Sequence, residues 1–131
     1  MTCLDKDTCF AFNGTQSQAN TYLYKSTNAS MGKNSTWTKA TLPAGFATST
    51  DITLAAVFFA PDKRHGWAVG NNNRKPLLLR TSDAGLTWVD ISGQVAALAD
   101  SDLVNGFALD KDRIWVVGRY GFVGTTGAAQ N

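Results

Sequence analysis

The chain alternates between short apolar runs and polar turns along most of its length. Runs such as Ala56–Phe59 and Leu77–Leu79 lie between segments rich in Gly, Pro, Asn, Asp, Ser and Thr. Apolar residues do not recur at the 3.6-residue spacing of an amphipathic helix, and strong helix formers other than Ala and Leu are scarce. Short runs bounded by turn residues are typical of strands. The pattern therefore predicts an all-β chain.

One pattern occurs three times without a gap. It starts with a small residue and one further position, which are followed by Asp-Lys and then by three turn residues. An aromatic residue and a short apolar strand complete it. The three copies are Cys3–Asn13, Ala60–Gly70 and Ala108–Gly118. Their spacing of about 50 residues is typical of the four-stranded blades of a propeller.

The remaining strands of each unit occupy matching places. An inner strand precedes the Asp-Lys turn, a third strand follows the aromatic strand, and a Thr-Trp pair marks the fourth. The third strands are expected at Tyr22–Ser26, Leu77–Thr81 and Gly121–Thr125, and the Thr-Trp pairs are Thr36-Trp37 and Thr87-Trp88. We therefore predict one domain over 1–131, a partial β-propeller of about three four-stranded antiparallel blades with repeat units at about 1–41, 53–92 and 103–131.

The segment Thr81–Trp88 carries a resemblance to a known repeat. Its sequence TSDAGLTW resembles the Asp-box, the bacterial neuraminidase repeat of pattern Ser/Thr-x-Asp-x-Gly-x-Thr-Trp, at all the defining positions. Together with HGWAVG at 65–70, it is similar to the propeller family of photosystem II assembly and stability factors. The first unit keeps Ser26, Asn28 and Thr36-Trp37 with extra residues in the turn, and the third unit has Gly127 in place of the Asp. The resemblance implies that this turn lies on the outer edge of a blade.

The residues of this segment suit a structural turn. An Asp can accept hydrogen bonds from backbone N–H groups that a tight turn leaves unpaired, and Gly permits positive φ. We therefore expect a structural role rather than catalysis or metal binding for this set: Thr81, Asp83, Gly85, Thr87 and Trp88.

Other candidate residues also favour structural roles. The aromatic residues at one repeated position, Phe10, Trp67 and Trp115, are expected to pack between blades. The repeated aspartates Asp5, Asp62 and Asp110 are expected to cap one turn three times, and His65 occupies a slot of that turn. The amide-rich and basic loop Asn71, Asn72, Asn73, Arg74 and Lys75 is the candidate ligand-facing loop.

The composition argues against catalysis. All ten acidic residues are Asp, and there is one His. Sialidases, whose propellers share the Asp-box, use a Tyr-Glu pair, which a chain without Glu cannot form. An Asp pair could still serve a glycosidase, although no spacing indicates one. We expect no catalytic residue, no cofactor and no metal site.

Charge and cysteine content narrow the class further. The net charge is +2, and no basic run forms a phosphate-tracking stripe, so no nucleic acid partner is expected. No signal peptide or membrane span is visible, and no membrane partner is expected. Cys3 and Cys9 suit neither a CxxC motif nor a zinc knuckle. Their spacing allows a hairpin disulfide, but we expect two reduced cysteines.

About three blades do not close a ring, because propellers have four to eight. We therefore expect self-association, with two copies forming a six-bladed homodimer, whereas a fragment of a longer propeller is the alternative. The expected function is a non-catalytic scaffold or protein-interaction module. A carbohydrate-binding propeller is the alternative, and a sialidase-related fragment is a third reading. The loops differ between units, which favours the scaffold over a lectin with repeated pockets.

Overall fold

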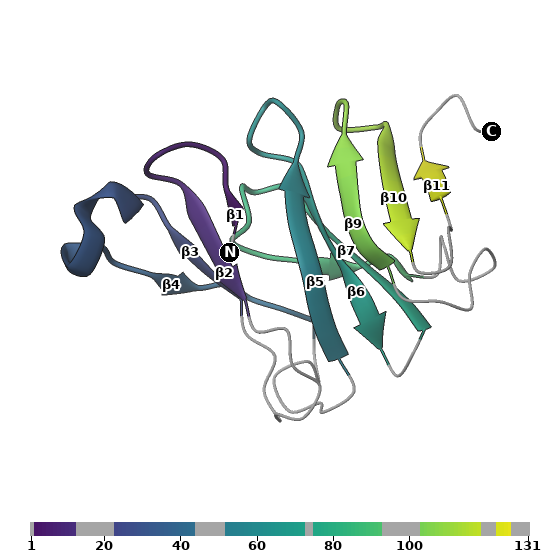
Figure 1. Ribbon diagram of the computed structural model, residues 1–131, viewed down its shortest axis with the longest axis horizontal. Coiled ribbons are helices and arrows are strands. Elements are labelled where there is room, and N and C mark those ends of the chain that lie inside the picture. The colour runs from purple at the N-terminus through teal and green to yellow at the C-terminus, as the bar shows by residue number, and fades with distance from the viewer. Residues whose placement is uncertain are drawn as a thin grey trace.

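The fold comes from a computed structural model, which describes residues 2–12, 23–43, 52–72, 75–92, 103–118 and 123–126. Within these ranges the strands form three antiparallel sheets that follow one another from left to right in Figure 1. The first sheet, blade 1, contains β1 (Thr2–Cys3), β2 (Cys9–Phe12), β3 (Leu23–Ser26) and β4 (Thr38–Lys39). Blade 2 contains β5 (Ile52–Phe59), β6 (Gly66–Asn72), β7 (Lys75–Thr81) and β8 (Val89–Asp90). Blade 3 contains β9 (Leu103–Ala108), β10 (Ile114–Gly118) and β11 (Val123–Thr126).

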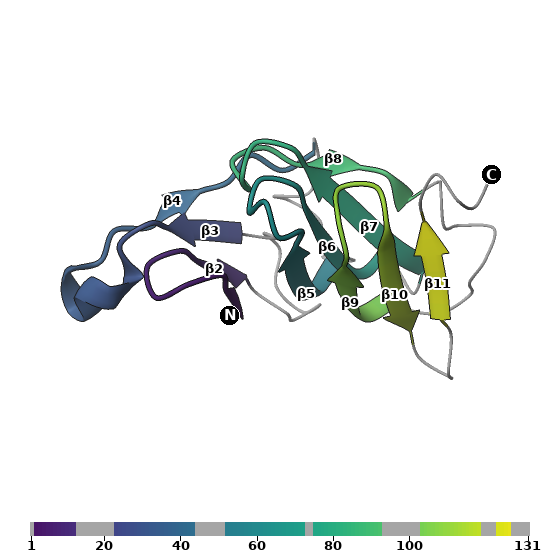
Figure 2. The ribbon, with the colours of Figure 1, turned by 90° about the horizontal axis from the view of Figure 1, so that it is seen from above.

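The strands of each sheet are paired in sequence order, as in the blades that the repeat predicts. Blades 1 and 2 have the orders β1-β2-β3-β4 and β5-β6-β7-β8, and β9, β10 and β11 repeat the first three places. Seen from above in Figure 2, the three sheets stand side by side. The all-β partial propeller expected from the sequence is thus the observed architecture.

Two local features differ from the expected pattern. The inner strand β5 starts at Ile52, four residues before the apolar run Ala56–Phe59, because it pairs with β6 along its whole length with a register shift between Leu54 and Ala56. The extra residues of the first unit form a 3-10 helix, η1 (Ala29–Asn34), which the sequence did not predict.

Each blade has two faces that can be told apart by its second strand. We call the face that carries Phe10, Trp67 or Trp115 the leading face of its blade, and the other the trailing face. Strand alternation places Ala11, Ala68 and Val116 on the trailing faces. The faces decide how successive blades pack.

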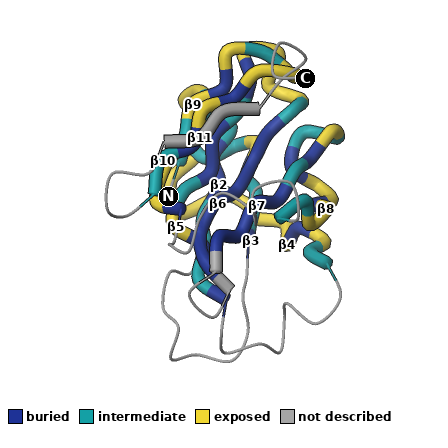
Figure 3. The backbone as a smooth tube through the Cα atoms, turned by 90° about the vertical axis from the view of Figure 1, so that its right-hand side faces the viewer, coloured by how far each residue is buried: buried dark blue, intermediate teal, exposed yellow. Residues whose placement is uncertain are grey.

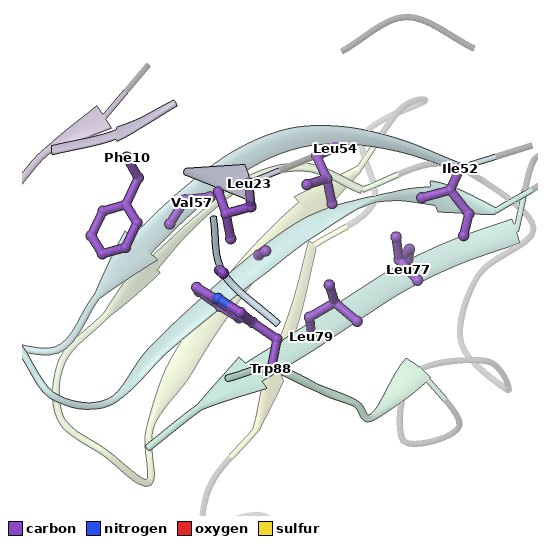
Figure 4. Close-up of a cluster of buried hydrophobic side chains, with 10 residues drawn as sticks. Phe10, Leu23, Ile52, Leu54, Val57, Leu77, Leu79 and Trp88 are labelled. Atoms are coloured by element: carbon purple, nitrogen blue, oxygen red, sulfur yellow. The ribbon is translucent and has the colours of Figure 1, made fainter. Parts of the chain in front are cut away.

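The core between blades 1 and 2 joins the leading face of one to the trailing face of the next (Figure 4). Phe10 and Leu23 of blade 1 are fully buried against the aliphatic side chains of blade 2. The Phe10 ring stacks on Phe59 at 4.9 Å between centroids, and Trp88 meets Phe59 edge-on at 6.1 Å. The blade 2 members of this buried cluster are Ile52, Leu54, Val57, Ala68, Leu77, Leu79 and Trp88.

The core between blades 2 and 3 repeats that arrangement. The leading face of blade 2 contributes Phe58, Trp67, Val69 and Leu78 to one buried cluster. The trailing face of blade 3 covers them with Leu103, Ala108, Ile114 and Val116. Burial of these aliphatic and aromatic side chains contributes most of the stabilising free energy, at about 25 cal/mol per Å² of apolar area.

The repeated aromatic position is therefore a packing position in two blades and not in the third. Phe10 and Trp67 are buried, but Trp115 is 40% exposed. The expectation that Trp115 packs between blades is not met, because no described residue covers the leading face of blade 3 (Figure 3, where exposed positions along β9 are yellow).

The two cysteines are joined, so the expectation of reduced cysteines was wrong. The Asp5 turn folds the chain back so that Cys3 and Cys9 are direct register partners across β1 and β2. Their Cα atoms lie 4.0 Å apart, and a disulfide connects their sulfur atoms. Cys9 is buried and Cys3 is exposed.

Reducing this disulfide is expected to lower the free energy of unfolding by about 2 kcal/mol, the chain-entropy value for so short a loop. Thermal unfolding with and without a phosphine reductant measures the effect. The Cys3→Ser/Cys9→Ser double variant is the control, since the reductant should not change its melting temperature. Equal melting temperatures for the oxidised and reduced wild-type chain would contradict the prediction.

Candidate functional site

In each blade, the turn between the first and second strands is built around an aspartate at the same position of the repeat. In each blade, one carboxylate oxygen accepts hydrogen bonds from the backbone N–H groups two and three residues later. Asp5 Oδ1 accepts from Asp7 and Thr8 at 2.9 and 2.8 Å, and Asp62 Oδ1 accepts from Arg64 and His65 at 2.9 and 3.0 Å. Asp110 Oδ1 accepts from Asp112 and Arg113 at 2.9 and 2.8 Å. Three carboxylates are thereby committed to turns.

These hydrogen bonds keep the three carboxylates ionised. The N–H groups of Asp7 and Thr8 lower the pKa of Asp5, and the backbone and ring of His65 lower the pKa of Asp62 to about 2. The Arg113 side chain lowers the pKa of Asp110. A carboxyl group with so low a pKa is already ionised near neutral pH, so it has no proton to donate there.

The turns also connect neighbouring hairpins and blades. Lys63 Nζ lies 3.1 Å from Asp5 Oδ2, an exposed ion pair between blades 2 and 1. Arg64 Nε donates to the carbonyl of Ser82 at 2.9 Å, so the two hairpin turns of blade 2 lie at the same end. Arg80 donates to the carbonyl of Lys111 in blade 3 at 3.3 Å. This end of the molecule is held by charged and backbone groups of adjacent blades.

The Thr81–Trp88 turn uses its polar side chains internally. Thr81 donates its hydroxyl to Asp83 Oδ1 at 2.8 Å, and the Thr87 N–H donates to the same oxygen at 2.9 Å. Gly85 has φ of 90° and donates its N–H to the Thr81 hydroxyl at 3.0 Å. The Trp88 indole donates to the Gly85 carbonyl at 3.0 Å, and its ring is buried. The structure thus brings all five predicted residues together in one turn.

Blade 1 builds the same turn with an amide. Asn28 Oδ1 accepts from the Ser26 hydroxyl at 3.0 Å and from the Thr36 N–H at 2.8 Å, as Asp83 does from Thr81 and Thr87. Asn28 Nδ2 also donates to the Thr36 hydroxyl at 3.1 Å. The turn therefore needs a side-chain acceptor at this position, and a negative charge is not required.

Replacements of Asp83 should lower the free energy of unfolding by an amount that depends on whether the new side chain is an acceptor. Asp83→Ala removes the acceptor of the Thr81 and Thr87 donors and is expected to cost about 2 kcal/mol of unfolding free energy. Asp83→Asn keeps an acceptor and is expected to cost less than about 1 kcal/mol. Urea unfolding of the two variants measures the difference, and equal losses would contradict it.

The charge of Asp83 adds a pH dependence. Partial burial raises the pKa of Asp83, but hydrogen bonds from Thr87 and Thr81 outweigh it and lower the pKa to about 2. Because the folded pKa lies below the ordinary value of 3.8, the stabilisation is complete above about pH 4 and is lost as the pH falls towards 2. Wild-type stability should therefore fall more steeply than that of Asp83→Asn over this interval. Parallel slopes would contradict the prediction.

The candidate loop at 71–75 is a strand hairpin for most of its length. Asn71 pairs with Pro76, and Asn72 pairs with Lys75, so β6 and β7 extend almost to the tip. Asn71 is only 8% exposed, so little of its side chain faces solvent. The reason is the extended β5–β6–β7 register. Residues 73 and 74, and the side chains of Asn72 and Lys75, lie outside the description.

His65 lies in the Asp62 turn, as its slot in the repeat predicted. Its ring nitrogen Nδ1 is 2.6 Å from Asp62 Oδ2. No cluster of three or more His, Cys or Asp side chains suited to a metal ion occurs within the described ranges. The helical segment that the structure describes is too short to cross a membrane.

One surface feature was not predicted from the sequence. Phe107 and Trp115 are register partners on the leading face of blade 3, and they are 62% and 40% exposed. Val104 and Leu109 of the same blade are also exposed. Phe107 and Trp115 are aromatic like the buried Phe58 and Trp67 of blade 2. Only the arrangement of the blades shows that the blade 3 pair is exposed.

Comparisons with known proteins agree with this architecture. No family model matches the sequence, and no curated protein does. A solved structure described as "YCF48 bound to D1 peptide" matches with a TM-score of 0.70 and 22% sequence identity, covering 98% of this chain and 36% of that chain. The chain thus spans about a third of the length of that structure. The likeness shows a shared fold and agrees with the propeller resemblance, whereas the Asp-box assignment remains a prediction.

Proposed function

We propose that the chain is a non-catalytic β-propeller module that binds a protein segment. The observation that carries the proposal is the outer edge of β11. In blades 1 and 2 the third strand pairs with a fourth, as Lys25 does with Thr38 and Arg80 with Val89. Within the described ranges, β11 pairs only with β10.

An unpaired strand edge presents main-chain N–H and C=O groups to a partner. An extended peptide can add to such an edge as a further strand, with main-chain hydrogen bonds supplying affinity. A peptide paired with the outer edge of β11 (Val123–Thr126) would occupy the place that the fourth strand takes in the other two blades. The solved structure similar to this chain is of a protein bound to a peptide. The strand-addition mode is proposed from the edge of β11.

Four of the described carboxylates are poorly suited to the role of a general acid. Asp5, Asp62, Asp83 and Asp110 each accept hydrogen bonds from backbone N–H groups of their own turns and have lowered pKa values. Such groups are ionised near neutral pH and are used structurally. A general acid needs a pKa near the working pH.

Fluorescence anisotropy with a labelled D1 peptide, together with a glycan array, tests the proposal. Saturable binding of the peptide and no glycan signal are expected. A control peptide in which alternate backbone amides are N-methylated should bind more weakly, because it cannot complete the strand ladder. A signal for one class of sugar without peptide binding would instead favour the carbohydrate-binding alternative.

A further inference from the structure

The two interfaces between blades are built in the same way, and the outer faces of blades 1 and 3 are complementary in this arrangement. At both interfaces, the leading face of one blade packs on the trailing face of the next. The first blade therefore keeps a trailing face without a described neighbour. The leading face of the third blade likewise has no described neighbour.

The leading face of blade 3 matches a face that is covered elsewhere in the chain. Phe107 and Trp115 are register partners at the places that Phe58 and Trp67 occupy in blade 2. The blade 2 pair stacks at 5.9 Å and is 9% and 3% exposed. Blade 3 covers it so closely that a Cβ on Gly106 would lie 2.3 Å from the Phe58 ring. The natural cover for such a pair is the trailing face of another blade.

The trailing face of blade 1 matches the covered trailing faces at one position of its second strand. Ala11 occupies the β2 position that corresponds to Ala68 in β6 and Val116 in β10. Ala68 and Val116 are fully buried under the preceding blade, whereas Ala11 is half-buried. The register places Tyr24 and the Cys3–Cys9 disulfide on the same face, where Ala11 is the small apolar position.

Charge agrees with the same order of blades. Between blades 1 and 2, the aspartate of the earlier turn pairs with the lysine of the later one, Asp5 with Lys63. The corresponding groups at the open ends are Asp110 of blade 3 and Lys6 of blade 1. They have opposite charges, but each is already paired within its own turn, Asp110 with Arg113 and Lys6 with Asp7, so they would have to exchange partners to meet when a copy of blade 1 follows blade 3.

We propose that the leading face of blade 3, centred on Phe107 and Trp115, docks on the trailing face of blade 1 of a second copy, around Ala11. The contact is head to tail, and it continues the internal interface between chains. In a two-fold dimer both such contacts form, and six blades complete a ring of ordinary propeller size. This docking does not depend on peptide binding at β11.

Sedimentation equilibrium of the full chain and of variants tests the proposal. The wild type should have twice the mass of one chain. Trp115→Ser and Ala11→Asp should each raise the dissociation constant about 100-fold or more, the loss typical of a central aromatic contact. Leu86→Asp, at an exposed outer turn on neither face, should leave the dimer unchanged.

Mixing separates the head-to-tail contact from other dimers. Trp115→Ser retains an intact blade 1 face, and Ala11→Asp retains an intact blade 3 face, so an equimolar mixture should form a heterodimer with one good interface. Ala11→Gln repeats the test with an uncharged side chain, and circular dichroism checks that every variant is folded. A monomeric wild type, a dimer that survives both Ala11 variants, or a mixture that stays monomeric would overturn the proposal.

Discussion

Replacing Gly85 with alanine is expected to lower the free energy of unfolding by roughly 3 to 5 kcal/mol. Gly85 has φ of +90°, a conformation that L side chains rarely adopt, and a Cβ there would lie 2.4 Å from Phe10 Cε1. The Phe10 ring is fully buried and stacked on Phe59, so it cannot move away without disrupting the blade 1 to blade 2 core. Urea unfolding followed by tryptophan fluorescence measures the loss.

Gly32 offers a control within the same chain. It also has positive φ, +59°, but a Cβ there would meet no atom within 4 Å. Gly32→Ala is therefore expected to cost only the backbone strain, about 1 to 3 kcal/mol. Equal losses at Gly85 and Gly32 would show that the turn of blade 2 does not press on Phe10.

Trp67→Ala and Trp115→Ala should differ sharply although the two tryptophans occupy equivalent positions. Trp67 is 3% exposed between blades 2 and 3, and truncating such a side chain costs about 3 to 5 kcal/mol. Trp115 lies on the open face, so the loss should be below about 1 kcal/mol in a dilute, monomeric sample. Thermal and urea unfolding at low protein concentration measure both values. Similar costs would mean that Trp115 is covered within the single chain.

Much of the architecture could be predicted because the turns repeat. The Asp-Lys turn specifies where the first strand ends and the second begins, and the aromatic residue then falls at a fixed distance from the carboxylate. The Asp5, Asp62 and Asp110 hydrogen bonds are the physical basis of that regularity. The Thr81–Trp88 turn was also recognisable, because its polar residues bond to one another locally.

The features that the sequence did not predict depend on register or on neighbours. The disulfide depends on Cys3 and Cys9 being exact partners across a hairpin, which spacing alone leaves open. The burial of Asn71 depends on how far β6 extends. The exposure of Trp115 depends on whether a blade covers it, and no local pattern reports that.

The blade faces and the strand edge have different roles in this account. The faces join blades to one another through apolar side chains. The edge of β11 is the site at which we propose that a protein segment binds through its main chain. Peptide binding and blade docking should therefore be separable by mutation, with Trp115→Ser weakening the dimer but retaining peptide binding.

Hydrogen exchange of the β11 amides, measured with and without the peptide of the binding assay, tests the central claim most directly. Alternate amides of an edge strand point away from its single partner and exchange readily. Binding by strand addition should slow exchange at those amides within Val123–Thr126 and leave the turns at Asp5, Asp62 and Asp110 unchanged. Protection confined to those turns, with none in β11, would contradict a module that binds through its open edge.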